Sequence, residues 1–223
     1  MKIISWNILA DEFIDSDYFM IPSELLNSVV RYEKIKNKII DADVILLQEV
    51  MGSFTEFTEH HIIRGKDMIW QGVKSSSCAM ILLRKSLFSI SSILYLDFGV
   101  GVYCTYKDTS LLIINIHLDD LSHDVRMRQI NSLVFNSIPV ILGGDFNEEG
   151  LYPEGFTVWN NKPTYFMGET LCIDNILTRG FESTRGFELT KEFNSCHVDN
   201  VNDVVSQFEL YGSDHLPVIL EKN

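Results

Sequence analysis

The sequence predicts an α/β fold in which two packed sheets are flanked by helices. Apolar runs with the length and β-branched content of strands outnumber the segments with helical periodicity. The helical segments fall between the strands, a pattern that indicates layers of sheet and helix. Several apolar runs are also continuous, which predicts strands that are buried on both faces.

Each expected strand is a short apolar run that ends at polar residues. In chain order these runs are residues 2–8, 44–50, 78–83, 90–96, 101–106, 111–118, 139–142, 171–177 and 216–220. Helical signals are fewer. Residues 31–41 place Ile35 and Ile39 on one helical face, a second helix is expected to start at Ser53, and a third spans 122–136. The residues of the third helix that are expected to face the core are Val125, Ile130, Leu133 and Val134.

The composition is that of an ordinary globular protein. Hydrophobic residues make up 46% and charged residues 22% of the 223 residues, so we expect one catalytic domain over residues 1–223. No apolar run approaches the ~18 residues that would span a bilayer, so no membrane partner is expected. Because there is no recognisable secretory leader and the four cysteines are scattered singly, we expect free thiols in an intracellular protein, cytoplasmic rather than nuclear. One disulfide pair stays open as an alternative.

Acidic residues outnumber basic ones. The formal net charge is −13, and Lys and Arg form no cluster in the sequence. Proteins that bind the phosphate backbone of long nucleic acids normally carry a basic surface. The charge therefore favours a small or single-stranded substrate, or a site in which a bound metal ion supplies the positive charge.

Polar side chains follow continuous apolar runs at the points where strands are expected to end. Glu49 follows one run, His117 another, and Asp145 and Asn147 a third. Rigid element ends beside loops are where catalytic groups usually lie. The full set of such side chains is Asn7, Glu49, His117, Asp145, Asn147, Asp174, Asp214 and His215.

This set contains oxygen donors and imidazoles but no thiol. Oxygen donors suit a hard cation such as Mg²⁺. Histidines beside carboxylates suit proton transfer and phosphate binding. The combination matches phosphoester hydrolysis, in which a metal neutralises phosphate charge and an acid–base pair handles the attacking water.

Each group also has a purely structural interpretation. Glu49 is typical of a solvated strand end, the Gly-Gly-Asp-Phe-Asn stretch at 143–147 is typical of a turn, and the histidines are typical of core or rim positions. Asp174 is harder to explain in this way, because a carboxylate inside an apolar strand needs a partner.

The order of the motifs resembles a known superfamily. Six segments occur in sequence: Ser5-Trp6-Asn7-Ile8-Leu9-Ala10-Asp11, Leu47-Gln48-Glu49-Val50, Asn115-Ile116-His117-Leu118, Gly144-Asp145-Phe146-Asn147, Ile173-Asp174-Asn175-Ile176 and Ser213-Asp214-His215-Leu216-Pro217. They resemble the motifs of the endonuclease/exonuclease/phosphatase superfamily over nearly the whole chain. The resemblance implies its fold, a four-layer α-β-β-α sandwich of two mixed sheets flanked by helices.

The resemblance also implies a role for each position. Glu49 would be the principal ligand of Mg²⁺, for which Mn²⁺ can substitute, with Asn7 beside it. Asp214 would lie in or near the metal shell. Asp145 would orient or deprotonate the attacking water, and Asn147 would bind the phosphoryl oxygen or position that water.

Two histidines complete the implied machinery. His215 would contact the scissile phosphate and stabilise its developing charge. Asp174 would fix the tautomer and the orientation of that ring. His117 would be a second phosphate contact.

Within the superfamily, the first two motifs, with Arg31 and Ile35 on a helix between them, resemble the Ccr4/nocturnin-type deadenylase and 2′,5′-phosphodiesterase branch. The sequence departs from that branch at Trp6 and Asn175, where relatives have tyrosine. Asp119-Asp120 is similar to bacterial-type members instead. The long substrate-binding insertions of deadenylases are mostly missing.

Aromatic residues near the motifs are candidates for stacking on bases. They are Phe146, Tyr152, Phe156, Trp159, Tyr165 and Phe166. An anchor in the core or in a loop is the simpler interpretation of any single one. Tyr152, Phe156 and Trp159 directly follow the fourth motif, so we expect them to line the mouth of the site as a nucleobase platform.

The leading functional hypothesis is a Mg²⁺-dependent RNA exonuclease or oligonucleotide phosphodiesterase, with single-stranded RNA or a nucleotide as substrate. One alternative is an enzyme that removes a blocking group from a nucleic-acid end, as tyrosyl–DNA phosphodiesterases do. Another hydrolyses a small nucleotide or a phospholipid headgroup. A catalytically dead binding module is a third class, which the complete set of catalytic side chains disfavours. The oligomeric state is not predicted.

Overall fold

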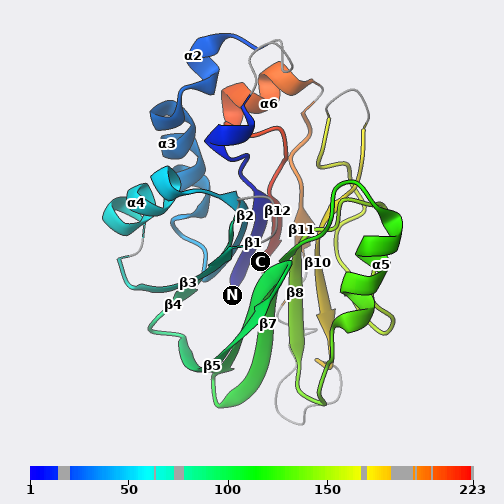
Figure 1. The fold of residues 1–223 in the computed structure, drawn as a ribbon. Coiled ribbons are helices and arrows are strands. Elements are labelled where there is room, and N and C mark those ends of the chain that lie inside the picture. The colour runs from blue at the N-terminus through cyan, green and yellow to red at the C-terminus, as the bar shows by residue number, and fades with distance from the viewer. Residues whose placement is uncertain are drawn as a thin grey trace.

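The computed structural model describes residues 1–14, 21–62, 64–72, 78–166, 170–181, 193, 195–201 and 203–221. These residues form two six-stranded sheets that pack face to face, with helices on their outer faces (Figure 1). The strand order is β11-β12-β1-β2-β4-β3 in the first sheet and β5-β6-β7-β8-β10-β9 in the second. The predicted sandwich of two mixed sheets flanked by helices is confirmed.

Each sheet is built around a parallel pair of strands. The first sheet consists of β1 (Lys2–Asn7), β2 (Val44–Val50), β3 (Lys66–Gly72), β4 (Cys78–Arg84), β11 (Ser195–His197) and β12 (Val218–Glu221). The second consists of β5 (Phe88–Leu96), β6 (Gly99–Tyr106), β7 (Thr109–His117), β8 (Val140–Asp145), β9 (Thr157–Val158) and β10 (Asp174–Arg179). β1 and β2 are parallel, as are β7 and β8, and their outer neighbours run antiparallel to them.

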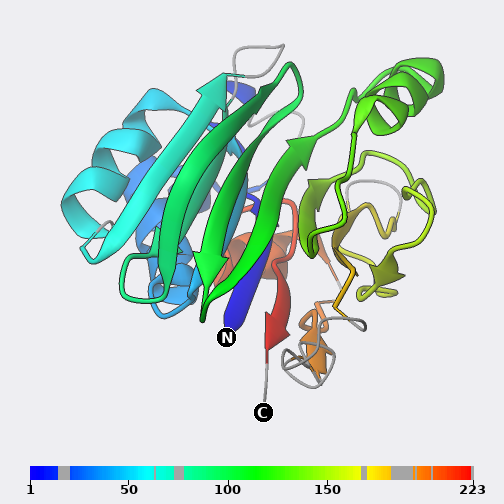
Figure 2. The same ribbon diagram turned by 90° about the horizontal axis from the view of Figure 1, so that it is seen from below.

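The helices complete the outer layers. They are η1 (Asp11–Phe13), α2 (Ser23–Leu26), α3 (Ser28–Ile39), α4 (Gly52–His61), α5 (His123–Ser132) and α6 (Val204–Leu210). α3 and α4 lie on one side of the sandwich and α5 on the other, as the view from below shows (Figure 2). None of the described helices is long and apolar enough to cross a membrane.

The main hydrophobic core lies between the sheets and continues under the helices of the first sheet. It includes Ile35 of α3 and Phe54 of α4 together with residues of both sheets. A second cluster packs Ile130 of α5 against the outer face of the second sheet. β8 is buried along its whole length, as its continuous apolar run predicted.

Several predicted boundaries are wrong. The third helix begins as expected, with the Ser122 hydroxyl accepting the Val125 N–H, but it ends at Ser132. Val134 lies beyond that end and is 79% exposed, so it does not face the core. Val125 is only partly buried and faces a cavity. The strand expected at 171–177 begins only at Asp174, because the chain before it forms an isolated bridge with Tyr165.

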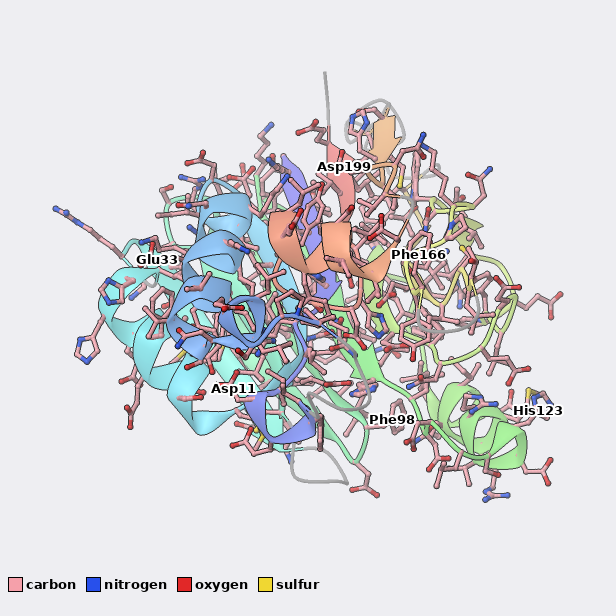
Figure 3. All side chains as sticks on the ribbon, turned by 90° about the horizontal axis from the view of Figure 1, so that it is seen from above. Asp11, Glu33, Phe98, His123, Phe166 and Asp199 are labelled. Atoms are coloured by element: carbon pink, nitrogen blue, oxygen red, sulfur yellow. The ribbon has the colours of Figure 1, made fainter. Side chains whose placement is uncertain are left out.

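The topology brings distant segments of the sequence to one edge of the sandwich. The parallel strands of both sheets end at this edge, and the antiparallel neighbours β10 and β12 begin there. Such carboxyl ends are where open α/β sheets place their ligands. Figure 3 looks down on this edge, with Asp11, Phe98 and Phe166 around it.

Candidate active site

Asn7, the last residue of β1, lies beside Glu49 near the end of β2. The Asn7 Nδ2 donates to Glu49 Oε1 at 2.8 Å and to Asp145 Oδ2 of the second sheet at 3.1 Å. The Leu9 N–H donates to Asn7 Oδ1 at 3.0 Å, and the Ala10 N–H donates to Glu49 Oε2 at 3.2 Å. The turn after β1 therefore orients Asn7 and Glu49, two of the three side chains that the resemblance assigned to the metal.

The backbone is strained at the strand ends that carry this site. Leu9, Glu49 and Asn147 have φ values of 53°, 55° and 51°. At Glu49 the pairing of β2 with β4 also shifts register, between Leu47 and Val50. Such conformations cost non-glycine residues roughly 1–3 kcal/mol and cluster at functional sites. At Glu49 the strain accompanies a side chain that is turned toward Asn7.

His117 and Asp145 occupy the corresponding ends of β7 and β8. They are direct partners in the pairing of these strands, and His117 Nε2 lies 3.8 Å from Asp145 Oδ2. Asp145 Oδ1 accepts the Asn147 N–H at 2.8 Å, and Asn147 Nδ2 donates to the Leu118 carbonyl at 2.9 Å. The second sheet thus presents its polar groups directly from paired strands.

The interpretation of residues 143–147 as a turn holds only for its end, where Asp145 accepts the Asn147 N–H beyond β8. Gly143 and Gly144 lie within β8. A Cβ on Gly143 would lie only 2.5 Å from Leu46 Cδ1 of the facing sheet. A side chain at this position would require the buried Leu46 side chain to shift, because the two sheets approach closely beside Asp145.

His215 and Asp174 form a buried pair that joins the two sheets. His215 precedes β12 and Asp174 begins β10. His215 Nδ1 lies 2.8 Å from Asp174 Oδ2 and 3.9 Å from Asp145 Oδ2. Asp174 is 0% exposed, and its N–H donates to Thr164 Oγ1 at 3.2 Å. His215 is therefore the partner that a buried carboxylate at this position requires.

Burial and neighbouring charges set the protonation of these groups. Burial alone would lower the pKa of His215, but Asp174, Asp214 and Asp145 together raise that pKa well above its usual value. Burial raises the pKa of Asp214 to about 6, and Glu49 acts in the same direction while His215 opposes it. So many carboxylates at one buried edge favour the binding of a cation.

The sequence-predicted residues surround a cavity of about 740 Å³. Those that line it are Glu49, His117, Asp145, Asn147, Asp214 and His215. Asn7 and Asp174 do not line the cavity. Asn7 forms a hydrogen bond with Glu49, and Asp174 forms one with His215. The rest of the wall includes the aromatic residues Phe13, Phe98 and Tyr165 and the acidic residues Asp97, Asp119 and Asp120. Within the described part of the chain, no Lys or Arg lines the cavity.

The aromatic residues expected at the mouth of the site lie elsewhere. None of the three lines the cavity, and each makes its contacts in the core or in a loop. These contacts pair Tyr152 with Asn175, Phe156 with Phe135, and Trp159 with Thr178. The anchor interpretation is therefore the better one for these residues, and the expectation of a nucleobase platform at 152–159 is corrected.

The donor set suits a hard divalent cation. Glu49, Asn7 and Asp214 offer oxygen atoms, and none of the described cavity residues is a cysteine. One ligand atom each of Asp145, Asp174 and His215 also lies within 4.8 Å of the others. In that second cluster His215 bonds Asp174 at 2.8 Å and Asp145 accepts a hydrogen bond from Asn7, so these contacts do not require an ion.

Other side chains support the site although the sequence assigned them no role in it. The Ser213 hydroxyl donates to the Asn7 carbonyl at 2.8 Å and accepts the His215 N–H at 3.2 Å. Trp6 Nε1 donates to the His215 carbonyl at 2.9 Å. Both residues lie inside motifs, which is a signal that points to them. Phe98 lies in a turn without any such signal.

A comparison with known protein families identifies the family of this chain. The model of the Endonuclease/Exonuclease/phosphatase family matches residues 4–215 of this chain. No curated protein sequence matches it.

Solved structures share the fold at low sequence identity. ANGEL2, a 2′,3′-cyclic phosphatase in complex with adenosine-2′,3′-vanadate, aligns with a TM-score of 0.73 and 16% identity over 98% of this chain and 94% of that one. D. rerio TDP2 complexed with a single-strand DNA product gives 0.73 and 15% over 99% and 97%. The human Nocturnin catalytic domain with a bound sulfate anion gives 0.68 and 15% over 99% and 92%. By its sequence motifs, its fold and the match to the family model, this chain belongs to the endonuclease/exonuclease/phosphatase family of enzymes that hydrolyse phosphoester bonds.

Proposed function

We propose that this protein is a Mg²⁺-dependent phosphodiesterase that acts on single-stranded RNA at or near an end, or on a short oligonucleotide. The convergence of six separate motifs on one cavity is the observation that carries the proposal. Oxygen donors from the first sheet face imidazole, amide and carboxylate groups from the second, as hydrolysis of a phosphodiester requires.

In this proposal Glu49, Asn7 and Asp214 hold the divalent cation. The cation, when bound, neutralises negative charge on the phosphate oxygens. Asp145 accepts a hydrogen bond from Asn7 and lies within 4 Å of both histidines, at 3.8 and 3.9 Å. This central position suits a carboxylate that orients the attacking water and takes its proton.

The remaining groups bind and neutralise the phosphate. His215 is held by Asp174 through Nδ1, so its other ring nitrogen, Nε2, would contact the scissile phosphate. The neighbouring carboxylates that raise the pKa of His215 favour the protonated, cationic ring that this contact needs. His117 and Asn147 supply further contacts to phosphoryl oxygens.

The size and charge of the cavity support a short or terminal substrate. A volume of about 740 Å³ lies within the usual range for small-molecule sites. The acidic wall formed by Asp97, Asp119 and Asp120 disfavours a long polyanionic duplex. The single-strand DNA product bound to D. rerio TDP2 is consistent with an accessible strand end. The same cavity also favours a second candidate, a small phosphoester such as the 2′,3′-cyclic phosphate that ANGEL2 is described as hydrolysing.

A substrate panel tests the proposal. The protein is assayed with Mg²⁺, with Mn²⁺ and with excess EDTA on single-stranded RNA, single-stranded DNA, 2′,5′-linked adenylate, a 5′-tyrosyl DNA end, a 2′,3′-cyclic phosphate end and a phospholipid headgroup ester. We expect cleavage of single-stranded RNA that requires Mg²⁺ or Mn²⁺ and stops with EDTA. Full activity in EDTA would exclude the metal mechanism, and exclusive action on another substrate would replace RNA with that substrate.

A further inference from the structure

The guanidinium of Arg31, in α3, is completely buried, with a side-chain exposure of 0%. Its Nη1 donates to Asp11 Oδ1 at 2.5 Å and its Nε donates to the Gly212 carbonyl at 2.6 Å. Its Nη2 donates to the carbonyls of Ile8, at 2.7 Å, and of Leu9. A buried cation normally requires such pairing, yet most of these acceptors are neutral backbone carbonyls. The hydrogen bonds of Arg31 therefore fix the backbone at Ile8, Leu9 and Gly212, in addition to pairing its charge with Asp11.

Two successive peptide units of the turn after β1 connect Arg31 to the proposed metal ligands. In the first unit the Ile8 carbonyl accepts from Arg31, while the Leu9 N–H donates to Asn7. In the second, the Leu9 carbonyl accepts from Arg31, while the Ala10 N–H donates to Glu49. Because a trans peptide is planar and its N–H and C=O point in opposite directions, fixing each carbonyl also fixes the direction of the N–H.

The same guanidinium holds the turn that precedes β12. Gly212 has a φ of +76°, and a Cβ on it would lie 3.0 Å from the Arg31 Cα, so this backbone lies directly against Arg31. The next residue, Ser213, bonds to the Asn7 carbonyl and to the His215 N–H. Arg31 thus contacts two of the three chain segments that supply the proposed metal ligands, those of Asn7 and Asp214, and it is linked to Glu49 indirectly, through the Ala10 N–H.

Among the described residues, the hydrogen bonds of Arg31 go to Asp11 and to carbonyls, and none goes to Glu49 or Asp214. The oxygens of those two carboxylates therefore stay free of the guanidinium. Burial lowers the pKa of Arg31 from its usual value, and Asp11 and the nearby carboxylates offset only part of that effect. Arginine remains charged even when it is buried, so its N–H groups can always donate hydrogen bonds.

We propose that Arg31 is a positioning residue for the divalent cation. It orients Asn7 and Glu49 through the two peptide units at 8–10 and fixes the turn that carries Asp214 through the Gly212 carbonyl. This inference rests on the ligands assigned in the proposed function. It adds a residue outside the cavity whose loss changes how tightly the metal binds.

Calorimetric titration of Mg²⁺ tests this, well below the melting temperature of each variant. Arg31→Met removes the donors, and Arg31→Lys keeps the charge but cannot reach all the carbonyls. Arg84→Met is the matched control, because Arg84 bonds Asp43 Oδ1 at 2.6 Å and the Asp41 carbonyl at 2.8 Å at the opposite end of the same sheet. We expect both Arg31 variants to weaken binding by roughly 10–100-fold, as for other partners behind metal ligands. Arg84→Met should keep the parental Kd.

The outcomes separate this inference from the proposed function. If the parent binds Mg²⁺ and folded Arg31 variants keep its Kd, the positioning role is overturned while the proposed function stands. If the parent itself fails to bind Mg²⁺, both the proposed metal site and this inference are wrong. Gly212→Ala keeps the guanidinium but pushes the turn away from it, so it serves where Arg31→Met does not fold. An unchanged Kd in a folded Gly212→Ala variant would likewise overturn the proposal.

Discussion

The first sheet and the second sheet hold their polar groups at the shared edge by different means. His117 and Asp145 extend from paired, parallel strands, so the hydrogen-bond ladder itself fixes their backbones. Glu49 sits at a register shift with positive φ and depends on the turn after β1, which in turn depends on the buried Arg31. The proposed metal half of the site therefore relies on tertiary contacts more than the half of the second sheet, which is proposed to act on water and phosphate.

An arginine also stands behind the second sheet, and it differs in burial. Arg126 Nε donates to Glu148 Oε2 and its Nη1 donates to the Asp119 carbonyl, both at 2.8 Å, with a side-chain exposure of 11%. It joins the loops that follow His117 and Asn147 without contacting the peptide units that bond the catalytic groups. Two arginines thus hold loops at the shared edge, one beside each sheet, and the fully buried Arg31 bears more directly on the site.

The largest expected effect comes from neutralising one carboxylate in each half of the site, Glu49 in the first sheet and Asp145 in the second. Glu49→Gln keeps the shape but loses the charge, so Mg²⁺ affinity should fall by on the order of 100-fold or more and kcat/KM by on the order of 10⁴-fold. Asp145→Asn should lose rate by on the order of 10³-fold while its Mg²⁺ Kd stays near the parental value. Calorimetry and steady-state kinetics on both variants check this. Equal losses of metal affinity would show that the halves are not functionally distinct.

The next effect concerns the pair that joins the sheets. His215→Ala should reduce kcat by on the order of 10³-fold, because this ring acts mainly in the transition state. Asp174→Asn should also be severe, since an amide presents the wrong partner to Nδ1. The double variant should be little worse than His215→Ala alone, because residues that act as a unit are strongly non-additive.

Kinetics and thermal midpoints of both single variants and the double decide the matter. An independent, fold-stabilising role for Asp174 predicts a lower melting temperature and rate losses that multiply. That result would mean that Asp174 and His215 help to hold the two sheets together but do not act as a unit in catalysis.

The smallest effect tests which aromatic residues face the substrate. Phe98 lines the cavity, whereas Phe156 packs against Phe135 at a centroid distance of 4.9 Å. Phe98→Leu should raise KM several-fold with little change in kcat, given that stacking contributes roughly 1–3 kcal/mol per base. Phe156→Leu should leave KM unchanged. A raised KM for Phe156→Leu with a parental KM for Phe98→Leu would restore the platform first expected after the fourth motif.

The strands that the sequence did not predict lie at the edges of the sheets, although β5, also an edge strand, was predicted. β3, β9 and β11 were missed, and all three lie at sheet edges. An edge strand pairs on one side only, so it needs fewer apolar residues and shows a weaker pattern. The two strands with the clearest continuous runs, β2 and β8, lie at sheet centres, where burial on both faces demands such runs.

The sequence by itself determined the family, the sandwich and the polar groups of the site, because each motif couples an apolar strand to a residue type that the chemistry requires. Only the tertiary structure decided which side chains form the rest of the cavity and what Arg31 bonds. Phe13 of η1 and Phe98 of the turn before β6 are far apart in the chain, and so are Ile8 and Gly212, whose carbonyls meet Arg31. No local pattern encodes such contacts, because their geometry exists only once both sheets have packed and their ends share one edge.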